Sequence, residues 1–129
     1  MWSNCLFVAL GGGLGAVGRY LLSLIAAPWS FPVMTLLTNF LGAVVIGAVA
    51  QAAGQLPMSK SAVLFLKTGL CGGFTTFSTF SLETVELLEQ GRWAAGGGYI
   101  LASVGLCLAG GAAGAGPGVE DLLRMETRI

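Results

Sequence analysis

The chain has 129 residues, of which 55% are hydrophobic and only 9% are charged, and its formal net charge is zero. So few charges cannot cover an ordinary water-soluble surface, and no positive excess suggests a nucleic-acid partner. The sequence has no histidine, the commonest general base and metal ligand. The composition therefore predicts a small integral membrane protein.

Four stretches of the chain are apolar and long enough to cross a bilayer, which takes about 20 residues because roughly 30 Å of hydrocarbon is crossed at ~1.5 Å per residue. They cover about residues 5–27, 33–53, 64–82 and 93–115. The connections between them are short, and we assign no task to the charged tail, 119–129. We predict an all-α membrane protein in which residues 1–129 form a single four-helix transmembrane domain.

The first stretch is expected to be a membrane helix and not a cleaved signal peptide, because no Lys or Arg precedes Leu6 and the apolar run is too long. Gly11 and Gly15 are four apart, a spacing that lets another helix approach closely. Residues 13–18 fit a Gly-x-Gly-x-x-Gly pattern, but no strand is predicted before them, so dinucleotide binding is not expected. Arg19 either reaches out to interfacial water or forms a vestibule charge that draws anions in.

The second stretch carries polar residues on one helical face, at spacings of three and four: Thr35, Thr38, Asn39 and Gly42. Asn39 is the notable member, because a carboxamide in hydrocarbon is unfavourable unless it is hydrogen-bonded. It either joins helices or donates to a passing solute. The pattern alone favours the joining of helices.

The third stretch contains the most unusual run, Cys71–Phe80. Gly72 and Gly73 destabilise a helix, and the hydroxyls that follow need partners in hydrocarbon. Such backbone is tolerated at membrane depth only inside protein or along a watery path. We therefore predict a broken helix with function at the break. Phe77 and Phe80 are three apart, and their positive ring edges can attract an anion, although aromatic residues at this spacing usually form core.

Glu83 lies one turn beyond the aromatic pair and can face the same path. The fourth stretch places residues at intervals of four on a single stripe, polar in its first half: Tyr99, Ser103, Cys107 and Gly111. The three cysteines have no paired spacing, so packing is the preferred interpretation over a metal site or a disulfide. No combination of side chains suits catalysis, and we do not expect an enzyme.

Three stretches together resemble the Fluc (CrcB-type) fluoride-channel family: Gly69–Ser81 matches its third-helix signature, Gly11–Tyr20 ends in Gly-Arg-Tyr, and Thr35–Gly42 contains a Thr-Asn core. The resemblance covers roughly residues 6–107. It implies a passive, fluoride-selective ion channel that exports fluoride from the cytoplasm and lowers its toxicity. It also implies an antiparallel, dual-topology homodimer with two pores at its interface, located as a multi-pass protein in the bacterial plasma or inner membrane.

The resemblance assigns roles to individual residues. It implies a fluoride pathway formed by Asn39, Phe77, Ser78, Thr79, Phe80, Tyr99 and Ser103. Arg19 resembles the family's vestibule arginine, and Glu83 resembles the acidic residue beyond the phenylalanines. The backbone carbonyls of Gly72 and Thr75, from both subunits, are implied to hold a central structural sodium ion.

Fluoride is small and tightly hydrated, so a pore has to replace several water hydrogen bonds without trapping the ion. Neutral donors and ring edges in series meet that requirement. Cys107 and Gly111 depart from the family pattern, because hydroxyls often continue the fourth-helix track there. Either conduction is altered at this level or water substitutes.

Two other functions remain as alternatives. A dual-topology drug–proton antiporter needs a carboxylate within the membrane, and only Glu83 comes near one. A scaffold subunit joined by its glycine faces would show no ion flux. Basic residues nearly balance between the two sides of the predicted topology once the distal tail is discounted, which permits insertion in either orientation.

Overall fold

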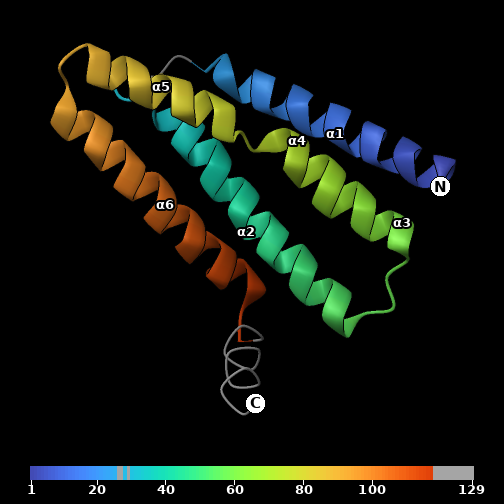
Figure 1. Cartoon of the computed structure of the whole chain (residues 1–129). Helices are drawn as coiled ribbons and strands as arrows, with labels where there is room; N and C mark the ends of the chain where they lie inside the picture. Colours follow the sequence, from blue (N-terminus) through green and yellow to red (C-terminus); the bar gives the residue numbers. More distant parts are fainter. Residues whose placement is uncertain (26–27, 29, 118–129) are drawn as a thin grey trace.

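The computed structural model describes residues 1–25, 28 and 30–117, and the predicted tail, 119–129, lies outside these residues. Every regular element in the described part is helical (Figure 1). The elements are α1 (Trp2–Ser23), α2 (Val33–Gln55), α3 (Lys60–Val63), the π-helix η1 (Leu64–Cys71), α4 (Gly72–Phe74), α5 (Phe77–Glu89) and α6 (Trp93–Ala115).

Three of these helices, α1, α2 and α6, are long and apolar enough to cross a membrane. Large apolar side chains on them stay exposed, such as Leu101 and Leu108 at more than two thirds of their surface, and hydrocarbon would cover them. The protein is therefore an all-α membrane protein. α1 begins and ends before the predicted limits of 5–27, whereas α6 spans the predicted range, 93–115.

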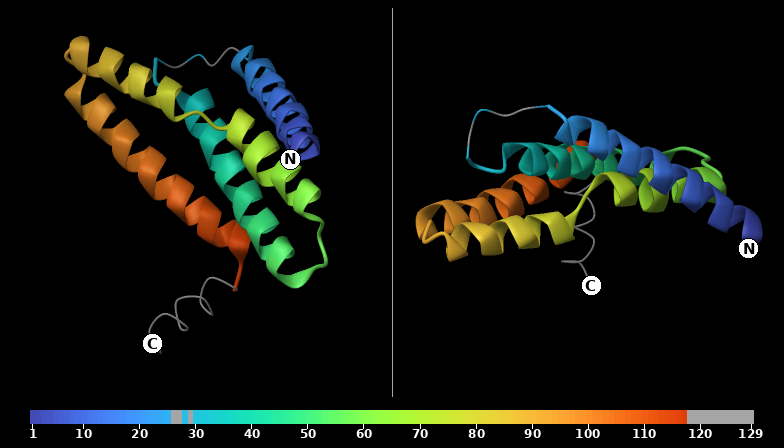
Figure 2. Two further views of the ribbon diagram at one scale, coloured as in Figure 1. Left: turned by 45° about the vertical axis from the view of Figure 1, so that its right-hand side comes forward. Right: turned by 90° about the horizontal axis from the view of Figure 1, so that it is seen from above.

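α1 lies side by side with the segment from α3 to α4, and all the views agree on this (Figures 1 and 2). The helices come into backbone contact, because a methyl group on Gly11 would lie 2.9 Å from the Leu70 amide nitrogen and one on Gly15 would lie 2.7 Å from that of Phe74. The predicted close packing at Gly11 and Gly15 is confirmed.

α2 packs most extensively against α6. A methyl group on Gly47 would lie 2.8 Å from the amide nitrogen of Ala115, and one on Gly114 would overlap the carbonyl of Val44. Other α6 glycines have open space around them, Gly97 among them. Only some of the glycines in α6 therefore serve helix packing.

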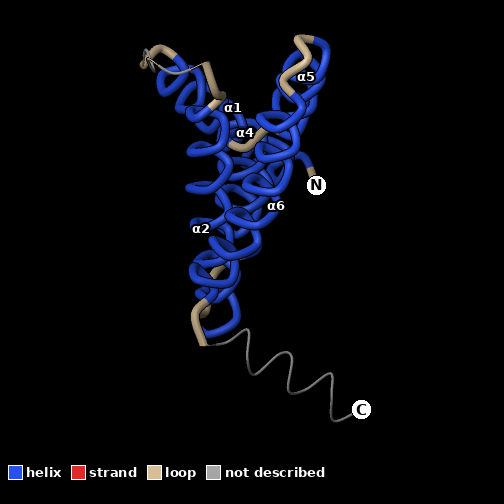
Figure 3. The backbone as a smooth tube through the Cα atoms, turned by 90° about the vertical axis from the view of Figure 1, so that its left-hand side faces the viewer, coloured by secondary structure: helices blue, strands red, loops and turns tan. Residues whose placement is uncertain are grey.

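The third predicted span is broken at Thr75 and Thr76, both extended, with φ,ψ of −81°, 156° and −150°, 109°. The prediction of a break within Cys71–Phe80 is confirmed, but Gly72 and Gly73 do not form it, because both are helical. A methyl group on Gly73 would overlap the backbone of α1, so this glycine serves packing. Figure 3 shows the break as a short non-helical piece within the bundle, beside α4.

α5 ends in a tight turn that brings α6 back alongside it. Gly91 has a φ of 74°, a conformation that suits glycine. The Gly91 and Arg92 amides donate to the carbonyls of Leu88 and Leu87, both at 3.0 Å, in a Schellman arrangement. The Arg92 side chain then donates to the backbone oxygen and hydroxyl of Ser30, at 3.1 and 3.0 Å, which ties this turn to the start of α2.

Candidate functional site

The break is held from α2 by the Asn39 side chain. The Thr76 amide donates to Asn39 Oδ1 at 2.7 Å, and Asn39 Nδ2 donates to the Thr76 carbonyl at 3.1 Å. One carboxamide thus pairs both backbone groups of an extended residue, which neither half-helix can satisfy. The structure confirms the interpretation that Asn39 joins helices.

Thr76 also caps α5. Its Oγ1 accepts from the Thr79 amide at 3.2 Å and donates to Thr79 Oγ1 at 2.9 Å, while Ser78 Oγ lies 3.3 Å away. A threonine at the N-cap satisfies an amide that the first helical turn leaves unpaired. Sequence reasoning missed Thr76, although a threonine directly before a helical run is an N-cap signal.

Arg19 reaches the break from α1. Its Nε donates to the carbonyl of Gly73 at 3.3 Å, and this carbonyl belongs to the last turn of the first half-helix. Carbonyls there lack intrahelical donors and carry partial negative charge, so a guanidinium is well placed. Arg19 also lines a small cavity of about 120 Å³ together with Thr79 and Glu83. Arg19 thus contacts a helix end. Neither interpretation from the sequence, contact with interfacial water or a vestibule charge, included this contact.

Glu83 connects three helices. Its carboxylate accepts from Thr35 Oγ1 of α2 at 2.8 Å and from the Tyr99 hydroxyl of α6 at 2.6 Å. Hydrogen bonds to an ionised acceptor are the stronger kind. Glu83 also lines both the small cavity beside Arg19 and a second one of about 240 Å³ beside Arg92.

Aromatic rings form a continuous series from the surface of the folded chain to its core. The ring centroids of Phe77 and Phe80 are 5.5 Å apart, and those of Phe80 and Tyr99 are 5.1 Å apart with an interplanar angle of 89°. Phe77 is 79% exposed, Phe80 is 9% exposed and Tyr99 is fully buried. Phe77 is therefore the ring of the pair that the chain leaves uncovered.

A cavity of about 460 Å³ lies between α2, the break, α5 and α6. Of the predicted pathway residues, it is lined by Asn39, Phe77, Phe80 and Ser103; Gly72 and Thr75 also line it, as do Cys71, Thr76 and Cys107. No described residue on this wall is charged. The Ser103 hydroxyl oxygen is buried with no hydrogen-bond partner among the described residues.

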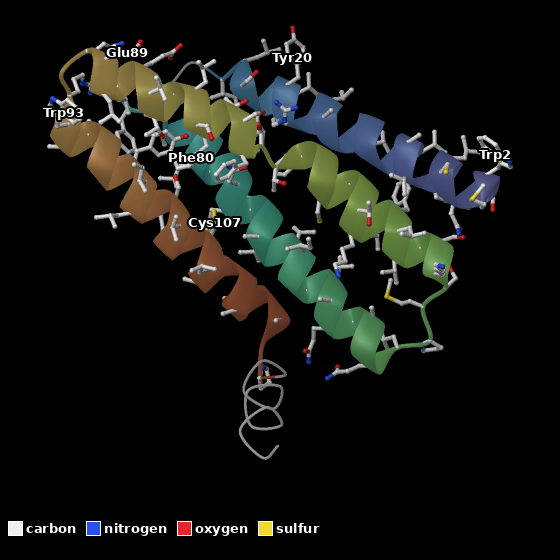
Figure 4. The ribbon with its side chains drawn as sticks, viewed as in Figure 1. Trp2, Tyr20, Phe80, Glu89, Trp93 and Cys107 are labelled. Carbon is white, nitrogen blue, oxygen red and sulfur yellow. The ribbon has the colours of Figure 1, made fainter. Side chains whose placement is uncertain are left out.

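The other predicted pathway residues do not line this cavity. Tyr99 stands behind Phe80, Thr79 lines the small cavity beside Arg19, and Ser78 is exposed at the start of α5. Figure 4 labels Phe80 and Cys107, whose side chains lie in the region between α5, α6 and α2.

The break also releases backbone carbonyls. In a continuous α-helix the carbonyls of Gly72 and Thr75 would accept from the amides of Thr76 and Thr79. These two amides instead donate to Asn39 Oδ1 and Thr76 Oγ1. The described chain contains no cluster of three or more His, Cys, Asp or Glu suited to a metal ion. Neutral carbonyl oxygens of this kind are ligands for a hard cation.

The fold and the site together define a multi-pass membrane protein with a broken helix and an uncharged cavity of rings and hydrogen-bond donors, an arrangement suited to solute passage. The sequence profile of the family described as CrcB-like protein, Camphor Resistance (CrcB), matches residues 6–115. The chain belongs to this family, and the curated relatives that match it are named as ion channels and not as enzymes.

Curated bacterial relatives match over most of their own length. The chain is 47% identical to a protein of Roseiflexus sp. over 117 residues, which covers 88% of this chain and 94% of the relative. It is 48% identical to a protein of Shewanella frigidimarina over 110 residues, which covers 82% of this chain and 88% of that relative. It is 43% identical to a protein of Gluconobacter oxydans over 113 residues, which covers 83% of this chain and 78% of that relative. Each is named a fluoride-specific ion channel, FluC. These similarities and the apolar helices identify the chain as a multi-pass bacterial membrane protein.

Proposed function

We propose that this protein is a passive, fluoride-selective ion channel that exports fluoride from the cytoplasm and so lowers its toxicity. The observation that carries the proposal is the 460 Å³ cavity, whose described wall combines two phenyl rings with neutral donors and no charge. Weak, multiple contacts suit conduction, because an ion has to leave each position as readily as it enters. The names of the relatives support fluoride as the ion.

Two donors on the cavity wall are available to an anion. The Asn39 amide nitrogen carries two hydrogens, and the Thr76 carbonyl takes one of them. The Ser103 hydroxyl has no partner among the described residues. The edges of Phe77 and Phe80 add positive electrostatic potential without a fixed charge. Fluoride would exchange its water for these groups in steps.

The finer proposal is an antiparallel homodimer with two pores at its interface. Phe77 supports it, since a ring that is 79% exposed on the cavity wall needs a second wall to enclose a permeating ion. The near balance of basic residues between the two predicted sides supports insertion in both orientations. Cross-linking in liposomes would test the dimer, and labelling of one terminus from each face of the membrane would test the two orientations. Monomeric protein, or protein inserted in one orientation only, would refute the arrangement.

We also propose that the carbonyls of Gly72 and Thr75 in both subunits hold a structural sodium ion. The amides that would bond these carbonyls in a continuous helix donate to side chains instead, which supports the proposal. Each carbonyl oxygen therefore keeps a lone pair for a cation. A bound sodium ion would attract these carbonyls of both subunits and so hold the two helix breaks together. The thermal midpoint of purified protein should rise with sodium relative to N-methylglucamine at equal ionic strength, and equal midpoints would refute the site.

The function is tested with purified protein in liposomes loaded with potassium fluoride or potassium chloride. Valinomycin starts electrically balanced efflux, and ion-selective electrodes follow each halide. We expect fast fluoride release and little chloride release. Equal release of both halides, or none from correctly assembled protein, would refute a fluoride-selective channel.

A further inference from the structure

We propose that Cys107 forms a binding site for thiophilic metal ions, mercury(II) being the representative probe, and that metal bound there blocks the pathway. The inference rests on the proposed function for its transport effect, whereas the metal site itself rests on geometry. The family resemblance does not supply it, since Cys107 occupies a position where hydroxyls often continue the polar track.

The first observation is the position of the thiol. Cys107 lines the same 460 Å³ cavity as Asn39, Phe77 and Phe80, and it is partly exposed. Figure 4 shows its side chain on the side of α6 that faces α2. A metal ion on this sulfur would therefore occupy space within the cavity.

The second observation is the unpaired hydroxyl one turn away. Ser103 is only 7% exposed, lines the same cavity and has no hydrogen-bond partner among the described residues. Residues four apart in a helix lie on one face. Leaving a buried hydroxyl unpaired is unfavourable, so water or a solute is expected to meet it. We therefore expect water in the cavity beside Cys107, through which a solvated metal species would reach the sulfur.

The other two cysteines provide native controls. Cys71 lines the same cavity but is 3% exposed, and Cys5 is exposed on α1 and does not line the cavity. Thiolate sulfur prefers soft metal ions over the hard cations that oxygen ligands bind. Access and position therefore both select Cys107 as the thiol whose metal complex would stop transport.

The chemistry is substitution without electron transfer. The S–H bond of Cys107 breaks, a sulfur–mercury bond forms, a chloride ion leaves mercury(II) chloride, and the proton goes to the buffer. Excess dithiothreitol reverses the reaction by taking the mercury onto its own two sulfurs. Block and recovery are therefore both measurable on one preparation.

The experiment uses the full-length protein in fluoride-loaded liposomes, with each variant compared with its own mercury-free rate. Micromolar mercury(II) chloride should reduce fluoride efflux to the leak of protein-free liposomes, and dithiothreitol should restore it. Cys107→Ser should be insensitive, whereas Cys5→Ser and Cys71→Ser should stay sensitive. Block that persists in Cys107→Ser, or fluoride efflux that mercury leaves unchanged in the parent protein, would overturn the proposal.

A binding measurement separates this proposal from the proposed function. In the Cys5→Ser/Cys71→Ser variant, Cys107 is the only thiol, and intact mass should show one mercury adduct that the triple serine variant lacks. Absence of the adduct would overturn the metal site. An adduct on protein that never conducts fluoride would support the site and would show that the proposed function had failed.

Discussion

The two halves of the broken helix are held in opposite ways. The first half, η1 and α4, meets α1 mainly through backbone, because glycines such as Gly15 remove the side chains between them. The second half, α5, meets α2 and α6 through side chains, with Phe80 against Tyr99 and Glu83 bonded to Thr35. Backbone contact fixes position and leaves no group for chemistry, whereas side-chain contact supplies rings and donors. The candidate pathway accordingly lies along the second half.

The junction between the halves depends on both neighbours. Asn39 of α2 pairs with the Thr76 backbone, and Arg19 of α1 donates to the Gly73 carbonyl. Neither of these two side chains belongs to the helix that breaks. The break is therefore a tertiary feature, and substitutions in the two halves and at the junction should have separable effects.

The largest effect is expected on transport, in the second half. Replacing both Phe77 and Phe80 with isoleucine removes the ring edges but keeps apolar volume, so fluoride efflux should fall to the liposome leak while assembly is retained. Phe65→Ile in η1 is the matched control, because Phe65 does not line the cavity. Efflux that survives in the double variant would remove the rings from the mechanism.

At the junction, Asn39→Ala should give the largest loss of stability. It leaves the Thr76 amide and carbonyl without their partner, at roughly 1–3 kcal/mol for each group. Asn4→Ala, which removes a single side-chain bond to Ser61, should cost much less. Thermal unfolding in detergent compares the two variants, and similar losses would mean that Asn39 does not hold the break.

In the first half, Gly15→Ala should be costly and Gly13→Ala should not. The methyl group at Gly15 would enter the backbone of Leu70 and Phe74, and overpacking of this kind costs roughly 1–3 kcal/mol. Gly13 has open space, so alanine there should stabilise the helix by at most about 1 kcal/mol. Equal stabilities of the two variants would contradict the backbone packing.

Glu83→Gln should slow fluoride efflux only moderately. The variant weakens two hydrogen bonds to a charged acceptor, and a loss of about 1.5 kcal/mol corresponds to a roughly tenfold lower rate of efflux. Transport should not stop, because a channel needs no titrating carboxylate. A proton-coupled antiporter would instead lose all coupled transport. A pH-sensitive dye inside the liposomes separates these outcomes, and proton movement that disappears with Glu83 would favour the antiporter.

The sequence was informative where a single residue type limits the structure. Paired glycines in an apolar stretch predict close helix contact, and a polar, glycine-containing run within one predicts a break. Which residues of that run form the break was not predictable, because this depends on the Asn39 carboxamide, 37 residues from Thr76, which pairs with the backbone there. Likewise the contact of Arg19 with Gly73 depends on how α1 packs, and no local pattern encodes that contact.

The smallest effect separates two roles for Arg19. Arg19→Lys keeps the charge but lacks the planar guanidinium that reaches the Gly73 carbonyl, so it should cost about 1 kcal/mol of stability, in the range of helix-end charge contacts. If Arg19 acts only by attracting anions, lysine should preserve both stability and the salt dependence of efflux. If it also positions the break, the Arg19→Lys protein should keep that salt dependence while the Thr75 and Thr76 amides exchange hydrogen faster. Unchanged exchange at these amides would assign Arg19 to electrostatic attraction alone, and the junction would then depend on α2 and not on α1.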